Sequence, residues 1–147
     1  MDENMTLLQR VPLFGGLTEA QLRPLAASAR ICLFPQDIAI VEQGQRTEEA
    51  QDGDSLYMIV DGHVRVVLER DGQEEKLNEL GPGDFFGEMA LLDGKPRSAT
   101  VIAEEDTQCL VLSRWDLLRA MRRNPEIGIR MLTAMSERLR GMQAMIA

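Results

Sequence analysis

The sequence is poor in aromatic side chains and in the residues that most often bind metals. Its 147 residues include one histidine and two cysteines, and aromatic residues make up 4% of the chain. A protein metal site needs several His, Cys or carboxylate ligands at matched spacing, which argues against a metalloenzyme. Cys32 and Cys109 lie far apart in apolar stretches, so we expect two separate buried thiols. His63 is expected to be an exposed strand residue.

Positive charge and long apolar runs are also scarce. The chain has 24 acidic and 16 basic residues, which gives a formal net charge of −8. Nucleic acids and anionic membranes attract basic surfaces, so we expect this chain alone to bind neither. No apolar run has the length of a membrane span, and residues 1–4 lack the basic and apolar regions of a signal peptide. We therefore expect a cytoplasmic protein in which a local site holds any anionic ligand.

The length and the 44% hydrophobic content fit one domain that spans residues 1–147. Residues 1–30 are expected to be mainly helical. Thr18 is a candidate N-cap, with Gln21 at the spacing of a capping box. Pro24 lies within the apolar pattern that follows, and we expect it to delay the helix or to kink it.

From residue 31 to residue 112 the pattern changes to short apolar runs separated by turn residues, which is typical of β-strands. Asp61-Gly62 and Asp71-Gly72 each predict a tight hairpin, because this dipeptide favours two positive φ angles. Residues 81–84 predict a further turn. Several short strands at this spacing indicate a sandwich or a barrel. The long polar loop at residues 44–54 is expected to be a solvated excursion, and the sequence assigns it no role.

Residues 113–147 are expected to form two helices. Ser113 is a candidate cap for the first, and Asn124-Pro125 separates it from the second, which runs to about Met145. Apolar residues recur in the second helix at alternating spacings of three and four, which predicts a heptad seam. This seam can serve either a dimer or the intramolecular core, and a second stripe can pack on the strands. The seam comprises Leu132, Met135, Leu139, Met142 and Ile146, and the second stripe Ile127, Met131 and Ala134.

The segment from Gly83 to Val101 carries the most specific chemistry. Gly87 allows an unusual backbone conformation before helix-compatible residues whose first amide groups can face an anion. Arg97 follows a proline, and its guanidinium suits two phosphate oxygens, while Ser98 adds a hydroxyl donor. Glu88 repels a phosphate but would accept from a hydroxyl group, and a ribose phosphate offers both. Taken alone, Glu88 and Arg97 favour a simple ion pair between two turns.

The whole string is more informative than the pair. Phe-Gly-Glu-x-Ala-Leu-Leu followed by Pro-Arg-Ser-Ala-Thr-Val resembles the phosphate-binding cassette of the cyclic nucleotide-binding domain family, and the resemblance extends from about Val11 to Met145. It implies a mainly β fold, an eight-stranded jelly-roll barrel flanked by N-terminal and C-terminal helices. It also implies that Arg97 binds the cyclic phosphate and that Glu88 accepts from the ribose 2′-hydroxyl. Further phosphate contacts are implied for the backbone amides of Gly87, Met89 and Ala90 and for Ser98.

Alignment with family members of the catabolite-activator type implies where the base lies. Met142 and Gln143 take the places of two hydroxyl residues that face the purine edge, and Val66 and Leu77 would contact its ring faces. The amide of Gln143 can serve adenine or guanine, so the ligand can be cAMP or cGMP. Ser98 slightly favours cAMP, because cyclic-GMP-dependent kinases tend to have Thr there.

These expectations describe a regulatory module in signal transduction rather than an enzyme, with a cyclic nucleotide as ligand and no cofactor or metal. No nucleophile, base and orienting group are clustered in the sequence. The C-terminal helices are expected to report ligand occupancy, and the last one to form a homodimer. One alternative is the ligand-binding half of a transcription regulator that continues past Ala147 into a helix-turn-helix. The other is a degenerate interaction domain, against which Glu88 and Arg97 weigh.

Overall fold

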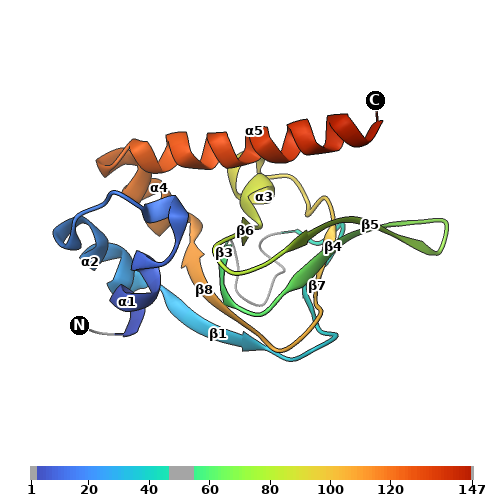
Figure 1. Cartoon of the computed structure of the whole chain (residues 1–147), viewed down its shortest axis with the longest axis horizontal. Coiled ribbons are helices and arrows are strands. Elements are labelled where there is room, and N and C mark those ends of the chain that lie inside the picture. The colour runs from blue at the N-terminus through green and yellow to red at the C-terminus, as the bar shows by residue number, and fades with distance from the viewer. Residues whose placement is uncertain (1–2, 47–54, 147) are drawn as a thin grey trace.

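The computed structural model describes residues 3–46 and 55–146, and Figure 1 shows sheets flanked by helices. The helical elements are α1 (Glu3–Gln9), the 3-10 helix η1 (Pro12–Phe14), α2 (Glu19–Ser28), α3 (Glu88–Asp93), α4 (Arg114–Arg123) and α5 (Glu126–Ile146). The strands are β1 (Arg30–Phe34), β2 (Ala39–Val41), β3 (Ser55–Asp61), β4 (Val64–Arg70), β5 (Gln73–Leu80), β6 (Phe85–Phe86), β7 (Thr100–Ala103) and β8 (Thr107–Ser113). Residues 47–54 of the long polar loop lie outside the described part of the chain.

These strands form two antiparallel sheets. The first sheet has the order β1-β8-β3-β6, and the second has the order β2-β7-β4-β5. Among the described strands, hydrogen bonding joins neighbours only within each sheet. The mainly β architecture with flanking helices is confirmed, but the described strands form a sandwich and not the closed barrel that the sequence led us to expect. A barrel needs strand pairing that continues around the whole sheet.

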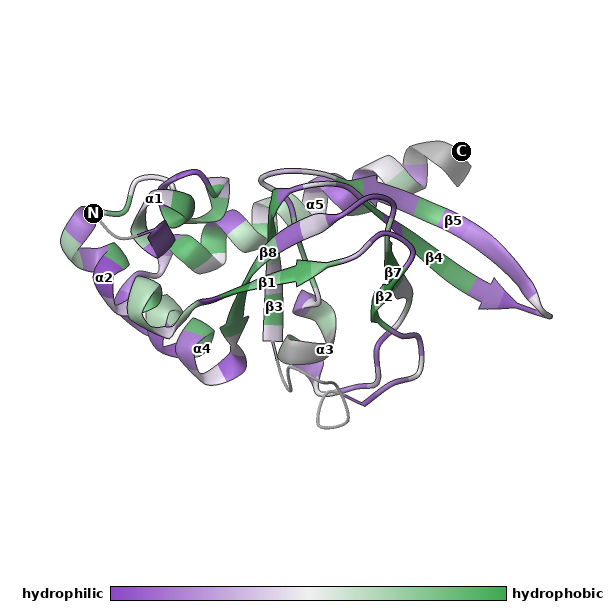
Figure 2. Ribbon diagram, turned by 90° about the horizontal axis from the view of Figure 1, so that it is seen from below, coloured by the Kyte–Doolittle hydropathy of each residue, from purple (hydrophilic) through white to green (hydrophobic). Residues whose placement is uncertain are grey.

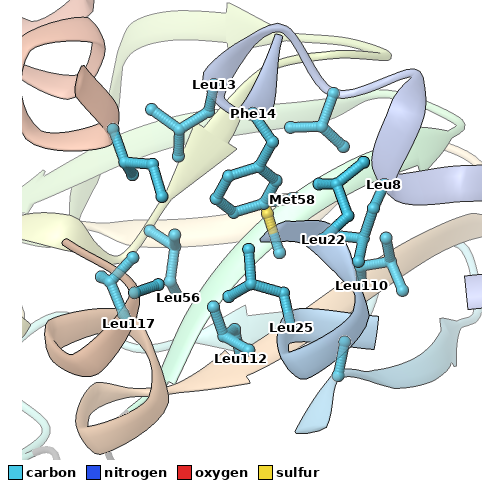
Figure 3. Close-up of a cluster of buried hydrophobic side chains, with 14 of the residues drawn as sticks. Leu8, Leu13, Phe14, Leu22, Leu25, Leu56, Met58, Leu110, Leu112 and Leu117 are labelled. Carbon is cyan, nitrogen blue, oxygen red and sulfur yellow. The ribbon is translucent and has the colours of Figure 1, made fainter. Parts of the chain in front are cut away.

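The central strands β3 and β8 of the first sheet are buried on both faces, which explains why they appear in the sequence as nearly continuous apolar runs. Leu56, Met58, Leu110 and Leu112 pack against the helices, as the close-up in Figure 3 shows. Tyr57, Ile59, Cys109 and Val111 alternate with them and pack against the second sheet. The fold therefore has three layers, with the first sheet in the middle.

Most of the local sequence predictions are confirmed. Thr18 forms the complete capping box with Gln21, and Ser113 caps α4 by accepting from the amide of Asp116. Asp71 and Gly72 both have positive φ angles at the tip of the β4–β5 hairpin. Pro24 neither delays α2 nor marks its end, because the helix begins at Glu19 and continues past the proline to Ser28.

The hairpin prediction for Asp61-Gly62 is wrong. Strands β3 and β4 do not pair with each other, since β3 belongs to the first sheet and β4 to the second. Gly62 has a φ of 102°, and a Cβ atom there would lie 2.5 Å from Oγ1 of Thr107. The dipeptide makes a crossing between the sheets, packed against the connection that leads into β8. His63 lies in this crossing and not on a strand.

Helix α5 contacts β6 and the first residue of α3 through Arg138, while the β4–β5 hairpin projects beyond the rest of the molecule (Figure 1). The outer half of this hairpin is polar (Figure 2). One side of α5 packs into the core through Ile127 and Met131, which are 0% and 1% exposed. Farther along the apolar pattern of this helix, Leu132, Leu139 and Met142 are 64%, 56% and 48% exposed. Within residues 3–46 and 55–146, no helix combines the length and apolar character needed to cross a membrane.

Candidate functional site

The cassette segment connects β6 to β7 and includes the short helix α3. The two residues of β6, Phe85 and Phe86, are both buried, and the ring of Phe86 stacks on that of Tyr57 with centroids 5.0 Å apart and planes 3° from parallel. Aromatic stacking and burial together fix the strand that leads into the turn. The backbone that leads into Gly87 is therefore held in a defined position.

Gly87 occupies a place that other residues cannot take without a shift of their neighbours. Its φ of +90° is unfavourable for residues with a side chain. A Cβ atom here would lie 2.9 Å from Nη1 of Arg97, 3.1 Å from the carbonyl oxygen of Ser55 and 3.3 Å from the ring of Tyr57. The glycine thus allows the guanidinium of Arg97 to approach the turn closely.

The side chain of Arg97 is inside the protein, with 4% of the residue exposed. Its Nη1 donates to the carbonyl oxygen of Gly87 at 2.8 Å, and Nη2 has a weaker contact with the carbonyl oxygen of Ser55 at 3.5 Å. The backbone of Arg97 is also fixed, because its amide donates to Gln45 and its carbonyl accepts from Gly44, both at 2.8 Å. The charged fork therefore lies directly beside the turn that precedes α3.

Glu88, which follows Gly87, forms an ion pair with the last helix. The residue is 7% exposed, and its Oε1 accepts from Nη1 of Arg138 at 3.2 Å. Arg138 also donates to the carbonyl oxygen of Phe85, and its guanidinium carbon lies 4.5 Å from the centre of the Phe85 ring. Cation–π contact and charge-assisted bonding act together here. Through Arg138, α5 is attached to the cassette segment at two positions, Phe85 and Glu88.

A groove of about 820 Å³ runs between α5 and the β5–β6 region. Its walls include Leu77, Phe85, Arg138 and Met142. This volume is in the range of small-molecule sites, which is roughly 300 to 1,000 Å³. The lining combines apolar side chains such as Leu77 and Met142 with polar and charged ones, and Arg138 connects the groove to the carboxylate of Glu88.

The structure brings together only part of the set of residues that the sequence indicated. Gly87, Glu88 and Arg97 meet at one turn, and Leu77 lines the groove. Val66 instead packs against the core between the sheets and does not line the groove. Met89, Ser98 and Gln143 are exposed, and Ala90 lies in α3, where only its backbone is described.

Arg138 is the site residue that sequence reasoning missed. It lies 50 residues from Glu88, so no local pattern links the two. One signal was available, because Arg138 precedes Met142 by four residues and such residues share a helix face. A cation on the face expected to contact the base was therefore a candidate for the site.

The sequence is similar to those of several known proteins. The sequence profile of the cyclic nucleotide-binding domain matches residues 34–124. The cyclic AMP receptor protein of Thermus thermophilus is 38% identical over 130 residues, which cover 88% of this chain and 57% of that protein. A cyclic nucleotide-gated potassium channel of Rhizobium etli is 36% identical over 125 residues, covering 85% of this chain and 32% of the channel.

Solved structures give the same result. The catabolite activator protein of Thermus thermophilus has a TM-score of 0.77 and 37% identity, with 92% of this chain and 61% of that one covered. A cyclic nucleotide-binding domain from Methylobacillus flagellatus has a TM-score of 0.78 and 28% identity, with 98% and 80% covered. The chain spans 57% or less of the two relatives described above. On the profile match, the sequence identity and the shared fold, this chain belongs to the cyclic nucleotide-binding domain family.

Proposed function

We propose that the chain is a regulatory module that binds a purine cyclic nucleotide, cAMP more tightly than cGMP. The proposal is supported by the buried guanidinium of Arg97 beside Gly87 and by the neighbouring carboxylate of Glu88. A cation and an acceptor at one turn suit a ligand that has both a phosphate and a hydroxyl group. Relatives named for cyclic AMP, cyclic GMP and cyclic nucleotide gating agree with this class of ligand.

In this proposal the cyclic phosphate contacts Arg97, Ser98 and the backbone amides of Gly87, Met89 and Ala90. The ribose 2′-hydroxyl donates to Glu88. The base enters the groove, where Leu77 provides an apolar wall. Gln143, which follows Met142 in α5, provides the polar group that hydrogen-bonds the base edge. Val66 contributes to the base site only if the second sheet shifts, because it packs against the core.

The observation that carries the proposal is the ion pair between Glu88 and Arg138. It places the expected ribose acceptor in direct contact with the helix that is expected to report occupancy. A carboxylate has acceptor sites for both an arginine and a hydroxyl, so the ligand adds a bond at a group that already contacts α5. Binding then favours one packing of α5 over others, which is a population shift.

The proposed module has no catalytic role, and its output is the altered position of α5. We propose that the output includes a homodimer in which Leu132 and Leu139 of the predicted seam meet their counterparts, since both are exposed along one helix. A cytoplasmic location is part of the same proposal.

A second candidate function is the ligand-binding half of a transcription regulator. It is favoured by the 38% identity to the cyclic AMP receptor protein of Thermus thermophilus, of which this chain spans 57%. Reading the gene beyond the codon for Ala147 tests it. A helix-turn-helix segment in the same frame supports this candidate, and a stop codon or an unrelated domain rejects it.

Calorimetric titration with cAMP, cGMP and cyclic dinucleotides tests the main proposal. We expect binding of both mononucleotides, tighter binding of cAMP, and no binding of the dinucleotides. Arg97→Lys is the matched variant, because it keeps the charge and removes the planar fork. Failure of the folded wild type to bind any of these nucleotides rejects the proposed ligand and leaves the degenerate interaction domain.

A further inference from the structure

Cys32 and Cys109 are direct cross-strand partners, although the sequence shows them as unrelated thiols. Cys32 lies in β1 and Cys109 in β8, and their Cα positions pair between Ile31↔Leu110 and Leu33↔Gln108. Opposed residues in an antiparallel ladder have Cα atoms about 4.5 to 5.5 Å apart. Disulfides typically join Cα atoms about 4.4 to 6.8 Å apart, so the register of these strands fits a cross-link.

The two thiols also face the same side of the sheet. Cys109 belongs to the apolar cluster between the two sheets, and Cys32 packs against that cluster. Ile31, the neighbour of Cys32, packs against the helices on the opposite face. This alternation is what a pleated strand requires, and it directs both cysteine side chains into the same layer.

The two positions differ in access to solvent. Cys109 is 0% exposed, whereas Cys32 is partly exposed and lies on β1, the edge strand of the first sheet. Edge strands open locally more readily than central ones, because they are hydrogen-bonded on one side only. Cys32 is therefore the thiol that a solute can reach, and Cys109 is the one placed to react with it afterwards.

We propose that Cys32 and Cys109 form a reversible intramolecular disulfide in the presence of a small-molecule disulfide such as oxidised glutathione. The thiolate of Cys32 attacks one sulfur of the oxidant, forms a mixed disulfide and releases one small thiol. The thiolate of Cys109 then attacks the sulfur of Cys32 and releases the second small thiol. The protein loses two electrons and two protons, and the oxidant is reduced to two thiols.

This cross-link would fasten the edge strand β1 to the central strand β8. It closes the chain from residue 32 to residue 109, a segment that contains the cassette and the walls of the groove contributed by β5 and the β5–β6 turn. A cross-link that closes a long loop stabilises the folded state mainly by restricting the unfolded chain. The inference does not depend on the proposed ligand, because neither cysteine is among the residues assigned to it.

The test uses the folded wild-type protein in buffers with increasing ratios of oxidised to reduced glutathione. Samples are quenched with a thiol-blocking reagent and analysed by intact mass and peptide mapping. We expect a product with the mass of a single chain less two hydrogen atoms, a Cys32–Cys109 linked peptide, and reversal by a dithiol reductant. The melting temperature of the oxidised protein should rise by about 5 to 10 °C.

Two variants keep the outcome decisive. Cys109→Ala preserves an apolar group at a fully buried position. In this variant the reaction should stop at a glutathione adduct on Cys32, because the second thiol is missing. Cys32→Ser should give neither product, because the remaining thiol is shielded. Two unmodified thiols in the wild type at an oxidising ratio, a stable adduct without the internal link, or a link between two chains would each overturn the proposal.

Discussion

Arg138 of α5 donates to Glu88 of α3 across 3.2 Å, and only 23% and 10% of the two side chains are exposed. This pair attaches the expected ribose acceptor to the last helix. Removing one partner of a shielded pair leaves the other charge poorly solvated, which costs more than the pair itself contributes. The Glu88→Gln and Arg138→Met variants and their combination form a double-mutant cycle in thermal or urea unfolding. We expect a coupling energy of about 1 kcal/mol.

Arg140→Met is the control for that cycle, because Arg140 is an exposed arginine two residues further along the same helix. It should change the unfolding free energy by less than about 0.5 kcal/mol. A coupling energy of zero between Glu88 and Arg138 would contradict a linkage between the cassette and α5.

Arg97→Ala should reduce cyclic nucleotide affinity about 30-fold or more, since loss of a charge-assisted contact in a shielded site costs about 2 to 5 kcal/mol. The burial of Arg97 and its bonds to Gly87 and Ser55 also predict a modest decrease in the melting temperature of the ligand-free protein, because these carbonyl groups lose a donor. Calorimetric titration and melting curves measure the two effects, and wild-type affinity would remove Arg97 from the phosphate site.

Leu139→Glu should convert a dimer to a monomer. Leu139 is 56% exposed in the middle of the expected seam, so the substitution places two like charges face to face in the dimer. Arg140→Glu, which introduces the same side chain beside the seam, should leave the dimer in place. Light scattering after size exclusion gives the mass of each variant. A monomeric wild type would leave only the intramolecular packing of α5.

Gln143→Ala should reduce the preference for cAMP over cGMP without abolishing binding. We expect a wild-type preference of roughly tenfold or less, about 1.4 kcal/mol, because one exposed side chain makes the choice. Leu77→Ala is the matched variant, since loss of an apolar wall should weaken the binding of both nucleotides equally. Competition titrations measure the ratio of cAMP to cGMP affinity in each variant. A ratio in Gln143→Ala equal to that of the wild type would mean that this residue does not read the base.

The bond from Nδ1 of His63 to Glu105 predicts a pH dependence of stability. Acceptance by Glu105 raises the pKa of His63 above its usual 6.5, and the charges of Glu104 and Glu79 act in the same direction. A raised folded-state pKa stabilises the fold below pH 6.5, and this contribution is lost as the pH rises through the higher value. Glu105→Gln should therefore lower the melting temperature more at pH 6 than at pH 8.5. Equal decreases in melting temperature at both pH values would show that protonation of His63 beside Glu105 does not stabilise the fold.

The sequence alone determined the features that depend on neighbouring residues. The cap at Thr18, the turn at Asp71-Gly72 and the break before α5 each follow from the backbone preferences of a few consecutive residues. The cassette was recognisable for the same reason, because Gly87, Glu88 and Arg97 lie within one short segment. Hydrophobic patterning also identified the strands and the buried stripe of α5, since periodicity records which side of an element is covered.

Only the tertiary structure decided which distant residues meet. Asp61-Gly62 has the composition of a hairpin turn, but β3 and β4 belong to different sheets and the dipeptide crosses between them. Glu88 meets Arg138, and Cys32 meets Cys109, because of where α5 lies and how β1 is registered on β8. Such contacts depend on the packing of whole layers, and a local sequence pattern describes one element but not the partner against which it packs.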